Sequence, residues 1–122
     1  MTETAGNVPC MSIQEVTVDE LATALEAGEH AVRVVDVRET DEYTSGHVPG
    51  AVLVVLGTVP QHVDEFRSPD GVTTYVICKA GGRSMQAAQY LAQQGVETVN
   101  VAGGTMAWIQ SGRSVVTGDQ PS

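Results

Sequence analysis

Residues 78–84, CKAGGRS, place a cysteine, two glycines and two basic residues within one short segment. The segment follows the apolar run VTTYVI and precedes SMQAAQYLAQQG, which has the pattern of a helix. The first amide N–H groups of a helix are unpaired and favour negative charge, and two glycines allow the backbone to curl so that amides point inward. With Lys79 and Arg83 nearby, the pKa of the Cys78 thiol should be lowered. A lone cysteine at a strand end is most often only a small buried side chain. The glycines and basic residues around Cys78 instead predict a nucleophilic cysteine.

A thiolate surrounded by amides fits two kinds of chemistry. It can attack a phosphate ester, or it can accept a sulfane sulfur and become a persulfide. Residues 79–82 separate Cys78 from Arg83, and cysteine phosphatases resemble one another in having one residue more in this gap. Because a shorter loop suits a single sulfur atom better than a tetrahedral phosphate, the spacing favours sulfur transfer. Arg83 would bind an anionic substrate with its fork of N–H donors.

Short apolar runs alternate with helical patterns along the rest of the chain. Strands are expected at residues 11–18, 31–38, 50–56, 72–78 and 96–104, and helices at residues 18–29, 39–46, 59–67, 84–95 and 105–112. This alternation predicts an α/β fold with a parallel sheet covered on both faces. The run at 50–56 is apolar throughout, as in a strand buried on both faces. Because ligands of such sheets bind at the carboxyl ends of the strands, residues 78–84 should meet DVRE and AGGT at one edge.

Composition excludes several classes of function. The chain of 122 residues fits one domain, and 6 basic against 15 acidic residues give a net charge of −9. Nucleic acid is not expected as a partner, because phosphate binding needs clustered Lys and Arg, and a membrane surface is disfavoured as well. No apolar run approaches the roughly twenty residues of a spanning helix, and the N-terminus lacks the pattern of a secretory signal, so a cytoplasmic location is expected.

Two cysteines and three histidines without close spacing predict no metal site. In the cytoplasm, Cys10 and Cys78 should be free thiols rather than a disulfide. Cys10 lacks a glycine-rich loop and basic neighbours, so no catalytic role is expected for it. His30 and His62 are expected at the surface, and Trp108 is expected to pack the last helix against the sheet.

Three stretches resemble signatures of the single-domain rhodanese family. VVDVRETDEYTSGHVPGAVLV resembles its first signature, CKAGGRS its active-site loop, and VAGGTMAWIQSG its C-terminal signature, Gly-Gly-x-x-x-Trp. The resemblance covers about residues 12–113. It implies a rhodanese-like three-layer sandwich, in which a central five-stranded parallel sheet has helices on both faces. The expected domain spans residues 10–116, between flexible segments at 1–9 and 117–122.

The resemblance also implies the activity of a thiosulfate sulfurtransferase. Cys78 would take the outer sulfur of thiosulfate or a similar donor, hold it as a persulfide, and release it to cyanide or a thiol acceptor in a ping-pong cycle. No metal or organic cofactor is needed, because the cysteine itself carries the sulfur. The loop would bind the substrate and stabilise the charged sulfur through Lys79, Ala80, Gly81, Gly82, Arg83 and Ser84.

Four further residues are expected to support this site. Asp36 ends a strand and can bond to neighbouring loops. Arg38 and Glu42 stand four positions apart and can pair, so structural roles are favoured for them, although Arg38 could instead face the pocket as a second anion contact. His47 lies in the tight connection SGHVPG, where a structural hydrogen bond is favoured over a role as general base.

Other functions remain open alongside the enzyme. The protein could be a sulfur carrier for a thiolation or cofactor-biosynthesis partner, and its negative surface would suit a basic protein acceptor. A phosphatase or arsenate reductase on the same fold is disfavoured by the loop length. A non-catalytic rhodanese-like module that binds a partner protein would typically lack the cysteine. The expected partners are a small-molecule sulfur donor and a thiophilic acceptor, and the expected state is a monomer.

Overall fold

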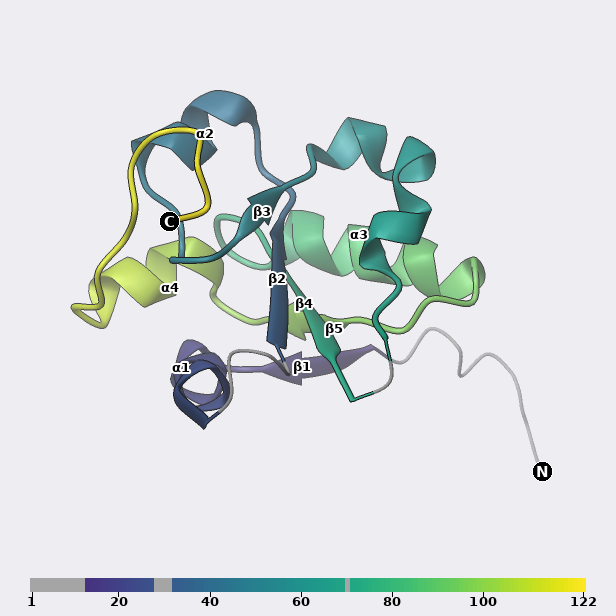
Figure 1. The fold of residues 1–122 in the computed structure, drawn as a ribbon, viewed down its shortest axis with the longest axis horizontal. Helices are drawn as coiled ribbons and strands as arrows, with labels where there is room; N and C mark the ends of the chain where they lie inside the picture. The colour runs from purple at the N-terminus through teal and green to yellow at the C-terminus, as the bar shows by residue number, and fades with distance from the viewer. Residues whose placement is uncertain (1–12, 28–31, 70) are drawn as a thin grey trace.

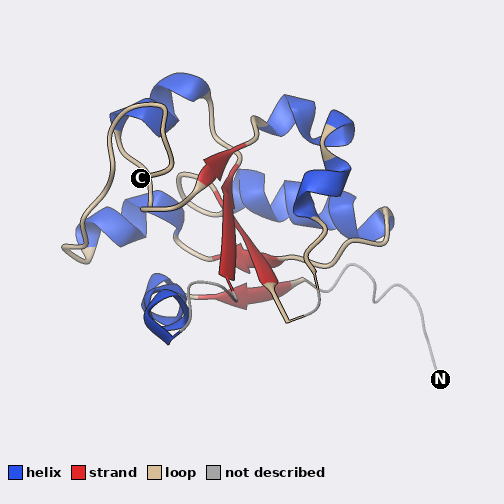
Figure 2. Cartoon of the chain, viewed as in Figure 1, coloured by secondary structure: helices blue, strands red, loops and turns tan. Residues whose placement is uncertain are grey.

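The computed structural model describes residues 13–27, 32–69 and 71–122, which form a parallel sheet between two layers of helices (Figures 1 and 2). The five strands lie in the order β1-β5-β4-β2-β3 and all pair in parallel. They are β1 (Gln14–Val16), β2 (Val32–Asp36), β3 (Val52–Leu53), β4 (Thr73–Ile77) and β5 (Val99–Val101). The helices are α1 (Val18–Ala27), α2 (Thr40–Ser45), α3 (Gly82–Gln93) and α4 (Gly104–Gln110), with 3-10 helices η3 (Leu56–Gln61) and η4 (Val63–Phe66). The predicted α/β fold with a five-stranded parallel sheet is confirmed.

The sheet has an apolar cluster on each face, because successive side chains of a strand point to opposite sides. Val34 and Ile77 pack with α1, α2 and α4 in one cluster, and Val35 and Val76 pack with α3, η3 and η4 in the other. Trp108 lies in the first cluster, as predicted, and its indole N–H donates to the carbonyl oxygen of Ser114 at 2.8 Å. Both faces of the central strands are therefore covered.

The structure corrects three predicted elements. β3 has two residues at the edge of the sheet and Val52 is 41% exposed, so the expected strand at 50–56 is not buried on both faces. The helix expected at 59–67 is instead two 3-10 helices, separated where His62 leaves the helical backbone region. Helix α3 begins at Gly82, so Arg83 lies within its first turn rather than before it.

The last ten residues return across α2, where Figure 1 shows the yellow end of the chain. Val116 pairs with His47 in an antiparallel bridge, and Gly118 N–H donates to the carbonyl oxygen of Thr44 at 2.8 Å. Gly50 N–H donates to the carbonyl oxygen of Pro121 at 2.8 Å. Residues 117–122 were expected to form a flexible tail, whereas the structure holds them by backbone hydrogen bonds, which leave no side-chain pattern in a sequence.

Among the described residues, no helix is long and apolar enough to cross a membrane.

Leu91→Ala should lower the free energy of unfolding by about 2–5 kcal/mol, because it opens a cavity beneath α3, where Leu91 is fully buried. Val52→Ala, at the exposed edge strand, should change it by less than about 0.5 kcal/mol. Urea unfolding followed by circular dichroism measures both values. Equal losses in the two variants would contradict the assignment of β3 to an exposed edge.

Candidate active site

Cys78 comes directly after β4, and its side chain lies in the turn that leads into α3. The residue is 1% exposed, and it is a free cysteine. Its Sγ accepts hydrogen bonds from the backbone N–H of Gly81 at 3.1 Å and from the hydroxyl of Ser84 at 3.3 Å. The amides reach the sulfur because Gly81 has φ of 110°, a left-handed conformation that favours glycine. The loop is therefore a set of donors directed at one sulfur atom.

Two opposing effects act on the pKa of the Cys78 thiol. Burial raises this pKa, because it disfavours the charged form. Hydrogen bonds from the Ser84 hydroxyl and from the backbone N–H groups of Ser84, Gly81 and Ala80 lower it, and together they exceed the effect of burial. The net result is a pKa below the ordinary value, as the sequence predicted, with the loop's own donors as the cause.

The segment AGGT, residues 102–105, runs into the first turn of α4, and this turn contacts the cysteine loop. Thr105 N–H donates to the carbonyl oxygen of Cys78 at 2.8 Å, and Met106 N–H donates to that of Lys79 at 2.9 Å. Gly104 makes this contact possible, because a Cβ atom there would lie 2.5 Å from both carbonyl oxygens, and its φ is 61°. The predicted meeting of AGGT with the cysteine loop at one edge is thus a direct hydrogen-bonded contact.

Arg83 does not point its guanidinium at open solvent. Its two terminal nitrogens donate to the two carboxylate oxygens of Glu42 at 2.8 and 2.9 Å, which joins α3 to α2. This hydrogen-bonded pair holds the pKa of Glu42 at about 2 and raises that of Arg83. Glu42 therefore pairs with Arg83, and the pairing of Arg38 with Glu42 that their spacing allowed does not occur, because α2 begins at Thr40 and Arg38 lies before it.

Arg38 pairs instead with Asp36 at the end of β2. Its Nε and terminal nitrogen donate to the Asp36 carboxylate at 2.8 to 3.1 Å, and the same terminal nitrogen donates to the carbonyl oxygen of Gly46 at 2.8 Å. Both side chains are buried. The pair ties the end of β2 to the connection before β3, so Arg38 is engaged inside the protein.

His47 is fully buried, and its ring stacks on Tyr43 with centroids 3.7 Å apart. Its Nδ1 lies 2.8 Å from the carbonyl oxygen of Tyr43, and its Nε2 lies 2.9 Å from that of Gln120. Both ring nitrogens therefore face backbone carbonyl oxygens, one in α2 and one in the C-terminal segment that crosses it. Cys10 and His30 lie outside the described residues, and the half-buried His62 is paired with Glu65.

Asn100, which contacts Ser84, and Glu15, which contacts Asn100, were not anticipated from the sequence. Asn100, in β5, is 1% exposed, and its Oδ1 accepts from the hydroxyl of Ser84 at 2.5 Å. Its Nδ2 donates to the Glu15 carboxylate in β1 at 2.8 Å and to the carbonyl oxygen of Gly81 at 3.3 Å. The available signal was a carboxamide between two valines in a buried strand, since such a group needs hydrogen-bond partners.

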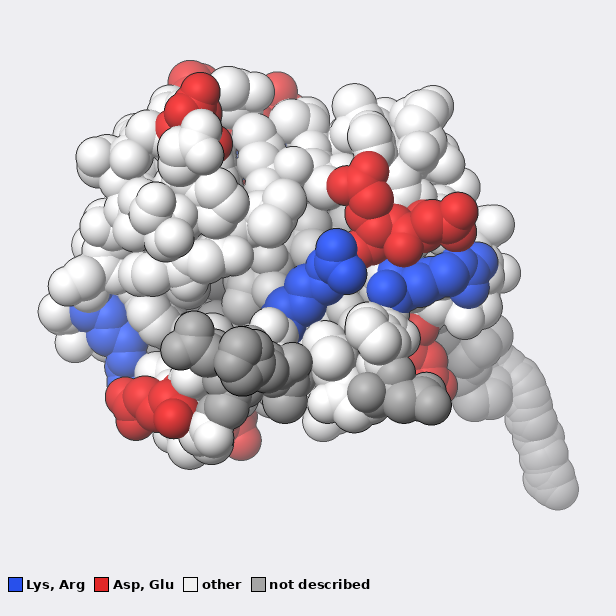
Figure 3. All heavy atoms as spheres, in the orientation of Figure 1, with Lys and Arg blue, Asp and Glu red and all other residues white. Residues whose placement is uncertain are grey.

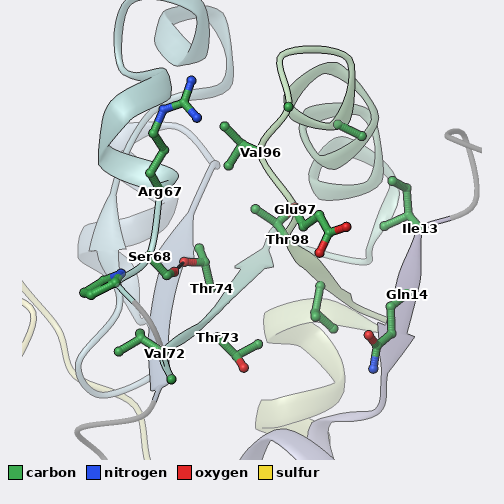
Figure 4. A pocket seen from close by; sticks show the side chains of 15 residues that line it. Ile13, Gln14, Arg67, Ser68, Val72, Thr73, Thr74, Val96, Glu97 and Thr98 are labelled. Carbon is green, nitrogen blue, oxygen red and sulfur yellow. Dashed lines mark hydrogen bonds between the residues drawn. The ribbon is translucent and has the colours of Figure 1, made fainter.

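Away from Cys78, the surface offers fewer groups suited to catalysis. A hollow of about 1030 Å³ lies at the opposite, amino-terminal edge of the sheet (Figure 4), lined by residues that include Gln14, Thr73, Glu97 and Thr98. On the face in Figure 3, basic side chains lie beside acidic ones, so the described residues form no broad basic area there. No cluster of His, Cys, Asp and Glu among the described residues could hold a metal ion. The groups suited to catalysis are gathered around Cys78.

Ser84→Ala should move the pH midpoint of Cys78 alkylation upward, because the thiolate loses a hydroxyl donor. The sign follows from the lowered pKa: the thiolate of the parent protein persists to lower pH than an ordinary thiol, and each lost donor reduces that advantage. Iodoacetamide labelling of a Cys10→Ser background, followed by intact mass across pH, gives the midpoint. A midpoint equal to that of the parent would show that Ser84 does not stabilise the thiolate.

Gly104→Ala should lower the free energy of unfolding by more than about 2 kcal/mol, because the added methyl group meets two carbonyl oxygens in a left-handed backbone. Cys78 alkylation at neutral pH should also slow, since the loop is displaced. Gly57→Ala is the matched control, because a Cβ at Gly57 meets nothing within 4 Å. Chemical unfolding and alkylation rates are measured side by side, and unchanged values for Gly104→Ala would contradict the close contact.

Comparison with known proteins identifies the family of the chain. A family model, the rhodanese-like domain, matches residues 17–111. A Bacillus subtilis (strain 168) protein named "Putative sulfurtransferase YtwF" is 40% identical over 99 residues, which cover 80% of this chain and 92% of that protein. Another protein of that strain, named "Putative sulfur carrier protein YrkF", is 35% identical over 98 residues, which cover 80% of this chain and 51% of that protein. The crystal structure of SSP1007 from Staphylococcus saprophyticus superposes with a TM-score of 0.67 at 42% identity, covering 76% of this chain and 90% of that one. The chain belongs to the rhodanese-like domain family.

Proposed function

We propose that the protein is a sulfurtransferase that carries a sulfane sulfur on Cys78. The observation that carries this proposal is the convergence of the Gly81 N–H and the Ser84 hydroxyl on Sγ, with a thiol pKa below its ordinary value. A thiolate of this kind is a ready nucleophile at neutral pH. The same donors suit the terminal sulfur of a persulfide, which also carries negative charge.

The reaction consists of two displacements at sulfur. In the first, the Cys78 thiolate attacks the outer sulfur of thiosulfate, so a new S–S bond forms and sulfite leaves with the electron pair of the broken bond. In the second, cyanide or an acceptor thiolate attacks the terminal sulfur of the persulfide. The bond to Sγ breaks, the thiolate of Cys78 is restored, and thiocyanate or a new persulfide leaves. The cysteine is the carrier in both steps, so the cycle needs no cofactor.

Donor binding falls to the loop of residues 79–84. Lys79 is exposed beside the sulfur and makes no ion pair among the described residues, so it is available to an anionic donor. Arg83 is paired with Glu42, so both of its terminal nitrogens already donate to a carboxylate that balances its charge. Backbone N–H groups in the first turn of α3, among them that of Ser84, supply the remaining donors. Thiosulfate as the donor and a cytoplasmic location, where thiols stay reduced, belong to this proposal.

A second function shares the first displacement and differs in the acceptor. A sulfur carrier would pass the persulfide sulfur to a partner protein rather than to a small molecule, and one relative bears the name of a sulfur carrier. Lys79 and Ala80, which directly follow the buried Cys78, are exposed, so an acceptor protein would meet the loop at these residues. A phosphatase is disfavoured, because the gap of residues 79–82 is short for a phosphate.

Incubation with thiosulfate should add the mass of one sulfur atom to the protein, and cyanide should remove it as thiocyanate. Cys78→Ser should gain no sulfur while its circular dichroism is unchanged, because the accepting thiolate is absent. Cys10→Ser is the matched control and should behave as the parent. Intact mass spectrometry and a colorimetric thiocyanate assay follow the two steps.

Sulfur gain by Cys78→Ser would overturn the assignment of the carrier. No gain by the parent protein with thiosulfate, accompanied by gain from a glutathione persulfide donor, would retain sulfur transfer and reject thiosulfate. Hydrolysis of an aryl phosphate without any sulfur gain would favour the phosphatase.

A further inference from the structure

Asn100 is a polar residue in the apolar layer between the sheet and α3. It pairs in register with Glu15 of β1 on one side and with Val76 of β4 on the other, so these side chains share one face of the sheet. Val76 belongs to the cluster packed under α3, and Asn100 is 1% exposed. A buried carboxamide is costly unless both its N–H groups and its oxygen are bonded. The partners of Asn100 therefore determine what it can do.

The orientation of the Asn100 carboxamide is fixed by groups that only accept. Its Nδ2 lies 2.8 Å from a carboxylate oxygen of Glu15 and 3.3 Å from the carbonyl oxygen of Gly81. The two protons of the NH₂ group match these two acceptors. Turning the carboxamide over would set its oxygen against both of them, so Oδ1 must face Ser84.

The hydroxyl of Ser84 has one proton and three acceptors within reach. Oδ1 of Asn100 lies 2.5 Å away, whereas Sγ of Cys78 and the carbonyl oxygen of Gly81 each lie at 3.3 Å. A single proton serves only one strong bond, and the shortest contact is the one to Asn100. Asn100 thus competes with the catalytic sulfur for the proton of Ser84.

The outcome of this competition depends on the charge of the sulfur. When Cys78 is a neutral thiol, Ser84 donates to Asn100 and its oxygen can accept the thiol proton. When the thiolate forms, the sulfur becomes the stronger acceptor, since hydrogen bonds to charged groups are stronger. Ser84 must then release Asn100 to reach it, and this loss reduces the stabilisation of the thiolate.

We propose that Asn100, oriented by Glu15, is a positioning residue that holds back the ionisation of Cys78 by competing for the hydroxyl proton of Ser84. The inference deepens the proposed function, because it concerns the same thiol. The fraction of Cys78 that is ionised for sulfur transfer then depends on a contact from Asn100 in β5 and on the exposed carboxylate of Glu15 in β1, which orients Asn100.

Other charged groups surround Cys78 and stay constant in the test. Lys79 is in the loop, Arg83 of α3 is paired with Glu42 of α2, and the Asp36–Arg38 pair closes the end of β2. None of them contacts Asn100 among the hydrogen bonds and ion pairs of the described residues. A change caused by Asn100 or Glu15 can therefore be separated from theirs.

The first test is Asn100→Leu in the full chain carrying Cys10→Ser. Leucine has a similar volume and suits the apolar layer, but it offers no acceptor to Ser84. The pH midpoint of Cys78 alkylation by iodoacetamide should move down, and the rate below the midpoint should rise roughly three- to tenfold, the worth of about one hydrogen bond. An unchanged or higher midpoint in the folded variant would overturn the proposal.

Glu15→Gln tests the orientation without touching the core, since Glu15 is exposed. A glutamine can either accept from or donate to the carboxamide, so only the carbonyl oxygen of Gly81 still directs Oδ1 of Asn100 toward Ser84, and the midpoint should again move down. Removal of a negative charge alone would act in the same direction. Glu97→Gln, at the opposite edge of the sheet, removes the same charge and should leave the midpoint unchanged.

The double variant Glu15→Gln/Asn100→Leu separates the two explanations. If Glu15 acts by orienting Asn100, the shift caused by Glu15→Gln should vanish when residue 100 is leucine. If Glu15→Gln moves the midpoint as far in the leucine background as it does with asparagine at residue 100, the effect is a through-space effect of charge, and the role of Glu15 is overturned. Alkylation reports on the thiol alone, so these results stand or fall independently of whether thiosulfate loads the protein.

Discussion

The hydrogen bonds that lower the pKa of a buried thiol, Cys78, are the interaction on which the rest of this site depends. Burial of Cys78 opposes ionisation, and only donors placed within hydrogen-bond distance reverse that effect. Such donors act on the sulfur only if the loop cannot relax away from it. The left-handed backbone at Gly81 directs its N–H to the sulfur, and the first N–H groups of α4 hold the loop's carbonyl oxygens from the other side. The N–H groups of Gly81, Thr105 and Met106 thus each have a partner within this region.

The parallel topology explains why three motifs far apart in the sequence meet here. β2, β4 and β5 lie side by side in the centre of the sheet, and Asp36 pairs in register with Ile77, the residue before Cys78. Val37 N–H continues this pairing by donating to the carbonyl oxygen of Ile77 at 3.0 Å. Since all strands point the same way, the segments that follow them share one edge. The Asp36–Arg38 pair, the cysteine loop and the glycines at the start of α4 therefore lie at the same edge of the sheet.

The sequence was sufficient for the order of elements, the parallel sheet and the position of the cysteine loop, because these follow from local periodicity and from short glycine-rich motifs. It was insufficient for the ion pairs. Arg38 and Glu42 stand at helical spacing, yet the helix begins at Thr40 and Arg38 lies before it, so the spacing rule does not apply. Arg83 meets Glu42 across forty-one positions of chain, a contact that no local pattern contains. The two-residue β3 also escaped prediction, because an apolar run does not reveal that its strand lies at the edge of the sheet.

Asn100 shows a different limit of pattern reading. In the chain it is one polar residue between two valines, and only the pairing of β5 with β1 sets it against Glu15. Its effect on the sulfur passes through Ser84, which comes from α3, so three separate elements must be in place before the contact exists. A site built in this way can be tuned from outside its own loop. The loop sequence defines which donors are present, whereas the strands beneath it determine how strongly one of them is available to the sulfur.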